Sequence, residues 1–129
     1  MPPRSYLFRI ADILDAIERI RRYTTKIPFD DFQKDSMRVD AVIRAFTVIG
    51  EAARMIPLEV QSAYPSVPWR EAQDMRNLLV HEYFGIDLTQ IWTTIELDLP
   101  VLEAALRPIL ATNVDGRHPE AGQERPSSD

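Results

Sequence analysis

Apolar side chains recur every three or four residues along the first part of the chain, and this period constrains the fold more than any other feature. The members of the repeat are Leu7, Ile10, Ile13, Leu14, Ile17 and Ile20. Because an α-helix has about 3.6 residues per turn, this spacing places them on one face of a helix. The pattern predicts a long amphipathic helix over residues 5–25, with Ser5 available as its N-cap.

A second helical repeat follows, and helix-breaking residues bound it. It begins at Asp35 or Ser36 and is expected to end at Ile56, because Pro57 cannot continue a helix. The segment between the two repeats, KIPFDDF, is predicted to be a connection with at most one helical turn after Asp30. The segment PLEVQSAY, which Pro57 opens, is typical of a short helix.

The segment PWREAQDMRNLLVHEYFG contains the next predicted helix. Pro68 suits the first helical position, and the apolar spacing after it predicts a continuous helix to Phe84. Gly85 directly follows, as is common after the last residue of a helix. The candidate catalytic residues of the chain lie in the last turns of this predicted helix.

Asp87 and Gln90 form a capping pattern that starts the last predicted helix. This helix is expected to be kinked or divided at Pro100 and to end near Leu110. No segment alternates like a β-strand for long. The sequence therefore predicts an all-α fold of four main helices and one short helix, most simply an up-down bundle.

Length and composition indicate one small globular domain. We expect a helical domain over residues 1–111 and a disordered acidic tail over residues 112–129, which has almost no large apolar side chain. No apolar run approaches the roughly 18 residues that span a membrane. We therefore expect no membrane protein, and the N-terminus also lacks the pattern of a secretory signal.

The charged and sulfur-containing residues exclude several classes of function. The chain has no cysteine, which rules out thiol catalysis and cysteine-based metal sites and agrees with a cytoplasmic protein. Its net charge is −5, so no overall positive field would attract a nucleic acid. If RNA binds, it is expected to bind at a local cluster of basic side chains.

The stretch MRNLLVHEYFG places Arg76, His81 and Tyr83 at Arg-x4-His-x-Tyr spacing. Histidine exchanges protons near neutral pH, and the arginine guanidinium can bind two phosphate oxygens at once. RNA carries its own nucleophile, the 2′-hydroxyl, so a base, an acid and a cation can suffice to cleave it. Arg76 and His81 are therefore candidate catalytic residues.

Three motif positions are a weak pattern when they stand alone. His81 could be a structural residue, Tyr83 could pack with its hydroxyl in water, and the arginine could merely pair with a carboxylate. The candidate carboxylates for that pairing are Glu51, Glu71 and Asp74. No acidic or histidine cluster has recognisable metal-ligand spacing, so we expect neither a metal nor another cofactor.

The helical wheel of the predicted motif helix separates the two candidate catalytic residues. Arg76 and Tyr83 are seven residues apart and share a face, whereas Arg76 and His81 come out roughly 140° apart on an ideal helix. A single exposed helix would therefore make a poor site. We expect a two-fold homodimer with the motif helices near the axis, which would also bring two copies of Arg76 together.

Several stretches outside the motif raise these expectations, because the chain resembles the HepT-like family of the HEPN group of helical domains. The likeness runs from about residue 7 to residue 110. It is carried by DILDAIERIRRYT, DAVIRAFTVIGEAAR, YPSVPWREAQDMRNLLVHEYFGIDLTQIW and DLPVL, in that order.

The resemblance implies a homodimeric bundle of four to five helices with the motif facing a cleft at the interface. It also implies the toxin of a type VII toxin-antitoxin pair, which cleaves RNA without a metal through Arg76 and His81. Asn77 matches a polar residue that often follows the motif arginine. The expected partner is an MntA-type nucleotidyltransferase antitoxin, which would neutralise the toxin by transferring AMP from ATP to Tyr83.

Some assignments stay open at this point. Glu51 is expected either to orient Arg76 or His81, or simply to pair with Arg54 or Arg44. The two tryptophans, Trp69 and Trp92, fit the core or a dimer interface better than a base-stacking role. A non-catalytic acceptor protein for the nucleotidyltransferase, or a nucleotide-binding module, remains an alternative to the ribonuclease.

Overall fold

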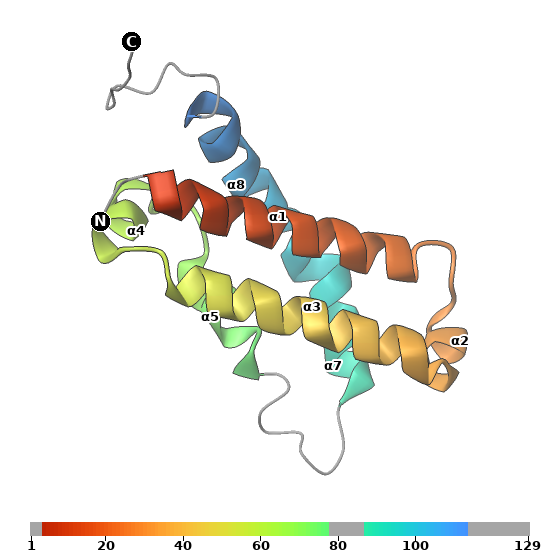
Figure 1. Cartoon of the computed structure of the whole chain (residues 1–129). Coiled ribbons are helices and arrows are strands. Elements are labelled where there is room, and N and C mark those ends of the chain that lie inside the picture. The colour runs from red at the N-terminus through yellow and green to blue at the C-terminus, as the bar shows by residue number, and fades with distance from the viewer. Residues whose placement is uncertain (1–3, 78–86, 114–129) are drawn as a thin grey trace.

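The computed structural model describes residues 4–77 and 87–113 of the chain. Every regular element within these two ranges is a helix, and neither range contains a strand, so the predicted all-α class is confirmed. The helices form two layers that enclose an apolar core (Figure 1). No helix in the described ranges is both long and apolar enough to span a membrane.

The front layer in Figure 1 consists of α1 (Arg4–Thr24) and α3 (Ser36–Arg54), which run antiparallel and pack against each other. The short helix α2 (Phe29–Lys34) joins them; it begins one residue before Asp30 and is longer than the single helical turn that the sequence predicted there. The first helix already includes Arg4, so Ser5 lies in its first turn. The prediction of Ser5 as N-cap was therefore wrong.

The apolar repeats that predicted α1 and α3 form the buried face between the layers. In α1, Ile10, Ile13 and Ile20 are completely buried, and Phe46 and Ile49 of α3 are buried with them. Burying a large apolar side chain stabilises the folded state by about 1.5–3 kcal/mol. The two helices are thus held by the residues whose spacing identified them.

The start of α3 is fixed by the capping chemistry of Asp35. Its carboxylate accepts the backbone N–H of Arg38 at 3.1 Å and contacts the Arg38 Nε at 3.0 Å. Arg38 in turn donates from Nη1 to the carbonyl oxygen of Tyr23 at 3.0 Å. The N-terminus of α3 is therefore tied to the end of α1.

α3 ends two residues before the predicted Ile56, because the chain turns at its C-cap, Met55. The predicted short helix after Pro57 is α4 (Leu58–Ala63), which is confirmed. Ile56 is buried and therefore belongs to the core although it lies outside the helix.

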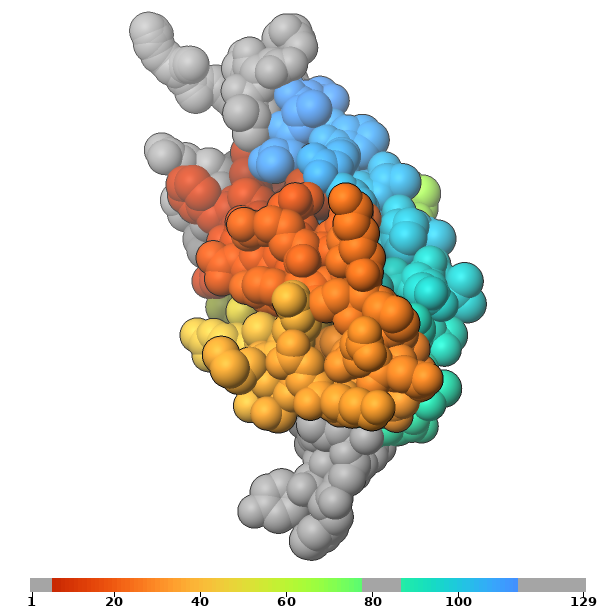
Figure 2. All heavy atoms as spheres, turned by 90° about the vertical axis from the view of Figure 1, so that its right-hand side faces the viewer, coloured from red at the N-terminus to blue at the C-terminus, as the bar shows by residue number. Residues whose placement is uncertain are grey.

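The back layer in Figure 1 is made by α5 (Trp69–Asp74), α7 (Leu88–Thr93) and α8 (Leu99–Thr112). Figure 2 shows the side of the molecule on which the front layer meets the second half of the chain. Side chains from both layers, such as Phe46 and Leu106, belong to one buried cluster.

The last helix divides near Pro100, as predicted. Asp87 caps α7, since its Oδ1 accepts the backbone N–H of Gln90 at 3.2 Å. The chain then widens into a π-helical turn, η1 (Thr94–Asp98), before α8 begins. Proline has no N–H, and its ring clashes with the carbonyl four residues earlier, so a wider turn relieves both problems.

α8 extends to Thr112, two residues beyond the predicted end at Leu110, so the predicted tail begins inside a helix. The remainder of that tail, residues 114–129, lies outside the described residues.

One carboxylate, Glu103 of α8, ties the two layers together at the surface. Its Oε1 lies 2.5 Å from Arg21 of α1, and its Oε2 lies 2.5 Å from Arg107. The hydrogen bond from Arg21 is the main reason why the pKa of Glu103 is lowered from its ordinary value. The ion pair joins the end of α1 to the middle of α8.

Candidate functional site

Arg76 lies in a turn that follows α5, and not inside a continuous helix to Phe84 as the sequence predicted. The amides of Met75 and Arg76 donate to carbonyls three residues earlier, at 3.2 and 3.4 Å. Such bonds tighten the last turn of a helix. Met75 is only 3% exposed, so its burial holds the turn in place. Pro68 precedes the helix as its N-cap and is not its first residue.

This turn removes the basis of the angle that the helical wheel assigned to Arg76 and His81. The roughly 140° separation assumed an ideal helix through both residues, and the chain departs from one at Arg76 itself. His81, Tyr83 and Gly85 lie outside the described residues. Their positions relative to Arg76 therefore stay predictions.

Gly50 of α3 lies directly against the backbone of Arg76. A Cβ atom added at Gly50 would lie 2.5 Å from the Arg76 Cβ and 2.8 Å from its amide nitrogen. Real side chains essentially never approach so closely, so α3 and the turn after α5 can meet at this distance only because position 50 has no side chain. Gly50 thus allows the backbone of Arg76 to lie directly against α3.

Glu51, the next residue of α3, forms an ion pair with Arg76. The Arg76 Nε lies 2.6 Å from the Glu51 Oε2. The Arg76 side chain is 37% exposed and that of Glu51 is 52% exposed. Ion pairs this exposed contribute only about 0–1 kcal/mol to stability. The pair therefore orients the arginine much more than it stabilises the fold.

The other two carboxylates that the sequence offered as partners of Arg76, those of Asp74 and Glu71, do not form an ion pair with it. Asp74 instead accepts the side-chain amide of Asn77 at 3.4 Å. Glu71 makes no ion pair within the part of the chain that the structure describes. Of the two expectations for Glu51, pairing with Arg54 or Arg44 is not observed either. The structure therefore brings together Arg76 and Glu51, while Asn77 is exposed beside them.

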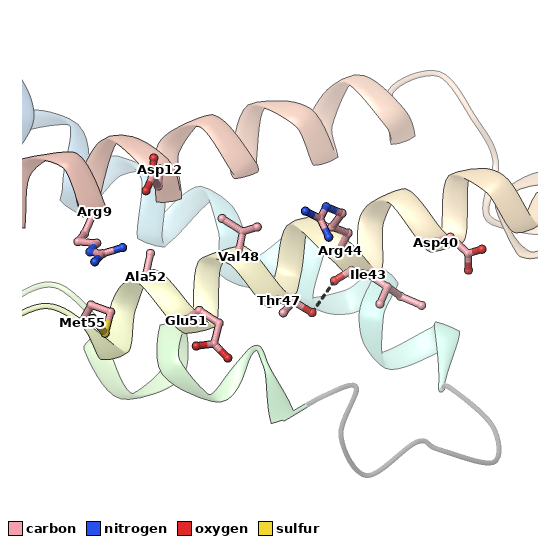
Figure 3. A pocket seen from close by; sticks show the side chains of 10 residues that line it. All are labelled: Arg9, Asp12, Asp40, Ile43, Arg44, Thr47, Val48, Glu51, Ala52 and Met55. Carbon is pink, nitrogen blue, oxygen red and sulfur yellow. Dashed lines mark hydrogen bonds between the residues drawn. The ribbon is translucent and has the colours of Figure 1, made fainter.

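A groove of about 700 Å³ runs over the outer face of α1 and α3, and Glu51 is one of its lining residues (Figure 3). Arg9 and Asp12 reach it from α1, and Asp40 and Arg44 reach it from α3. None of these four charged side chains makes an ion pair with any described residue. Exposed apolar side chains, Val48 and Met55, also line the groove.

The two tryptophans belong to the core, as expected. Trp69 is 7% exposed and donates its indole N–H to the carbonyl of Tyr64 at 3.0 Å. Trp92 is partly buried, with its ring centroid 5.4 Å from that of Phe29 and 5.0 Å from that of Phe32. Both rings therefore pack within the protein, Trp69 in the core and Trp92 against it.

Comparison with known proteins assigns the chain to a family. The family model described as "Ribonuclease HepT-like" matches residues 13–109. The chain belongs to the HepT-like family. This match covers all of the helices from α2 to α7 and most of α1 and α8.

Two of its relatives illustrate the likeness. A protein of Thermococcus cleftensis named "Probable ribonuclease HepT" is 43% identical over 100 residues, which are 78% of this HepT-like chain and 91% of that protein. A protein of Caldanaerobacter subterraneus named a "Putative RNase" is 39% identical over 109 residues, 84% of this chain and 94% of its own. No solved structure matches significantly.

Gly50 is the residue of the site that the sequence analysis overlooked. Its signal was an isolated glycine inside a strong helical repeat, in TVIGEAAR. Such a glycine costs about 1 kcal/mol relative to alanine and so usually has a packing reason. The reason here is the backbone of a residue 26 positions away, which the local pattern cannot show.

We predict that Gly50→Ala destabilises the protein although it replaces a helical glycine. Helix propensity alone would stabilise the variant by about 1 kcal/mol, but the added methyl overlaps Arg76 and should cost about 1–3 kcal/mol. Urea unfolding followed by circular dichroism measures the balance. Ala41→Gly, in a part of the same helix without this contact, sets the scale of the propensity effect together with the loss of one partly buried methyl group. A variant more stable than wild type would contradict the close contact.

Proposed function

We propose that this chain is a metal-independent ribonuclease in which Arg76 and His81 are the catalytic residues. The observation that carries the proposal is the state of Arg76. Its backbone packs closely against Gly50, its guanidinium is oriented by Glu51, and its side chain remains 37% exposed. An arginine held in this way can bind phosphate from solvent without first being ordered. The names of the relatives supply the substrate class, RNA.

The reaction needs only groups that the RNA and the motif contain. The 2′-oxygen attacks the adjacent phosphorus, and the bond from phosphorus to the 5′-oxygen of the next nucleotide breaks. His81 either takes the 2′-hydroxyl proton or gives a proton to the leaving 5′-oxygen, and water carries out the other proton transfer. Arg76 stabilises the negative charge that develops on the phosphoryl oxygens. The products are a 2′,3′-cyclic phosphate and a free 5′-hydroxyl.

The proposal includes a homodimer, and the groove on α1 and α3 supports this face as its interface. A two-fold interface must be complementary to itself. Unpaired charges of both signs around exposed apolar side chains satisfy that condition. Glu51 lines the same groove, so a second copy there would lie next to Arg76. A dimer with this interface would bring the two copies of Arg76 near each other, so that a chain with a net charge of −5 still presents a local cluster of positive charge.

The proposed biological setting is a type VII toxin-antitoxin pair with an MntA-type nucleotidyltransferase. In the inhibiting reaction, the hydroxyl oxygen of Tyr83 attacks the α-phosphorus of ATP, and pyrophosphate leaves. The product carries a phosphodiester charge seven residues from Arg76, where it would compete with RNA phosphate for the guanidinium. This part rests on the family resemblance, since Tyr83 lies outside the described residues.

We predict that the purified protein cleaves RNA in EDTA and that either Arg76→Ala or His81→Ala reduces the rate. Loss of a general acid or base typically costs about 10²–10⁴-fold, and loss of one charge-stabilising group about 10²–10³-fold. Gel analysis of labelled RNA, with the cyclic phosphate identified by mass, measures both. Arg107→Ala, which removes an exposed arginine far along α8, is the control. Equal cleavage by all three variants would refute the assignment.

We also predict that incubation with an MntA-type nucleotidyltransferase and ATP adds AMP to the protein and suppresses RNA cleavage. Intact-mass measurement detects the adduct, and Tyr83→Phe should remain unmodified because it has no hydroxyl. An unmodified wild-type chain would contradict the inhibition model. An adduct without any RNA cleavage by the free protein would instead favour the non-catalytic acceptor.

A further inference from the structure

We infer that Glu51 is a positioning residue for catalysis: together with Gly50, it presets the Arg76 guanidinium for an RNA phosphate. The inference rests on the proposed ribonuclease activity and adds a role that the motif does not contain. Gly50 and Glu51 are consecutive residues of α3, whereas Arg76 follows α5. Two neighbouring positions on one helix thus contact the same arginine, Gly50 at its backbone and Glu51 at its Nε.

The Arg76 side chain is restrained at its backbone and at its Nε. An arginine side chain is long and loses considerable rotamer entropy when it is ordered. Here the contact with Gly50 limits the position of the Arg76 backbone, and the 2.6 Å contact between Nε and Oε2 limits the position of the guanidinium. Because both ends of the side chain are held, few rotamers remain available. Part of the ordering cost of binding phosphate is thereby removed before RNA arrives.

The ion pair with Glu51 leaves N–H donors of the Arg76 guanidinium available for a phosphate. The observed contact uses the Arg76 Nε, and a guanidinium carries most of its N–H groups on its two terminal nitrogens. A carboxylate at Nε therefore leaves donors for a phosphate, which binds arginine best through two parallel hydrogen bonds. The partial exposure of Arg76 agrees with access to such a ligand.

The ion pair also determines the direction in which the Arg76 side chain extends. Asp74 and Glu71 lie on α5, the helix that precedes the turn of Arg76, and a pair with either would hold Arg76 along α5. The ion pair instead directs it to α3, on the side of that helix where Glu51 stands in Figure 3. Since Glu51 also lines the groove, the guanidinium is held at the edge of the surface that we propose for the second copy.

The same ion pair is also compatible with an inhibitory role of Glu51, in which its carboxylate neutralises the charge of Arg76 and repels the RNA phosphate. The two roles predict opposite effects of removing the charge. If Glu51 positions Arg76, Glu51→Gln slows the chemical step. If Glu51 blocks Arg76, the same substitution accelerates cleavage.

The test compares steady-state cleavage of RNA by wild type, Glu51→Gln and Glu51→Asp. We expect Glu51→Gln to lower kcat by on the order of 100-fold, the effect of a small misplacement of a catalytic group, with KM little changed. Glu51→Asp keeps the charge on a shorter side chain and should retain part of the activity. Glu59→Gln is the matched control, because Glu59 is exposed and makes no ion pair among the described residues.

A second readout does not depend on cleavage. The Nε–H resonance of Arg76, assigned by its loss in Arg76→Lys, should move in Glu51→Gln and not in Glu59→Gln. Unchanged kcat, faster cleavage, or an unmoved Nε–H signal in Glu51→Gln would each overturn the inference. If wild type cleaves no RNA, the proposed function fails, while the Nε–H signal still decides whether Glu51 holds Arg76.

Discussion

The close contact between Gly50 and the Arg76 backbone is the constraint on which the rest of the site depends. It brings the turn after α5 against the middle of α3, closer than any side chain at position 50 would allow. This approach puts Glu51 within reach of the Arg76 Nε. A mobile surface arginine thereby becomes an oriented group at the edge of the groove on α1 and α3.

The apolar period and the capping residues predicted most of the fold correctly. The repeat that begins at Leu7 identified α1 and its buried face, and Asp35 and Asp87 marked the starts of α3 and α7. These features succeed because they are local: a helix face or a cap depends on residues three or four apart. The break near Pro100 was predictable for the same reason.

The motif region shows where local patterns fail. The apolar spacing continues through Met75 and predicted an unbroken helix, but the chain turns there because Met75 is buried and Arg76 meets Gly50. Both contacts join residues far apart in the sequence, so no periodicity reveals them. The helical wheel that favoured a dimer does not apply at Arg76, because Arg76 lies in a turn. The proposed dimer is instead supported by the groove on α1 and α3, which is visible only in the folded chain.

The most direct test of the central claim is whether Arg76 itself receives an RNA phosphate. A short RNA with methylated 2′-hydroxyls cannot be cleaved through the proposed reaction, so it can be titrated into protein with isotope-labelled arginine side chains. We expect a saturable shift of the Arg76 guanidinium signals, while those of Arg107 stay in place. Binding of this RNA without any change at Arg76 would contradict a phosphate-binding role for Arg76.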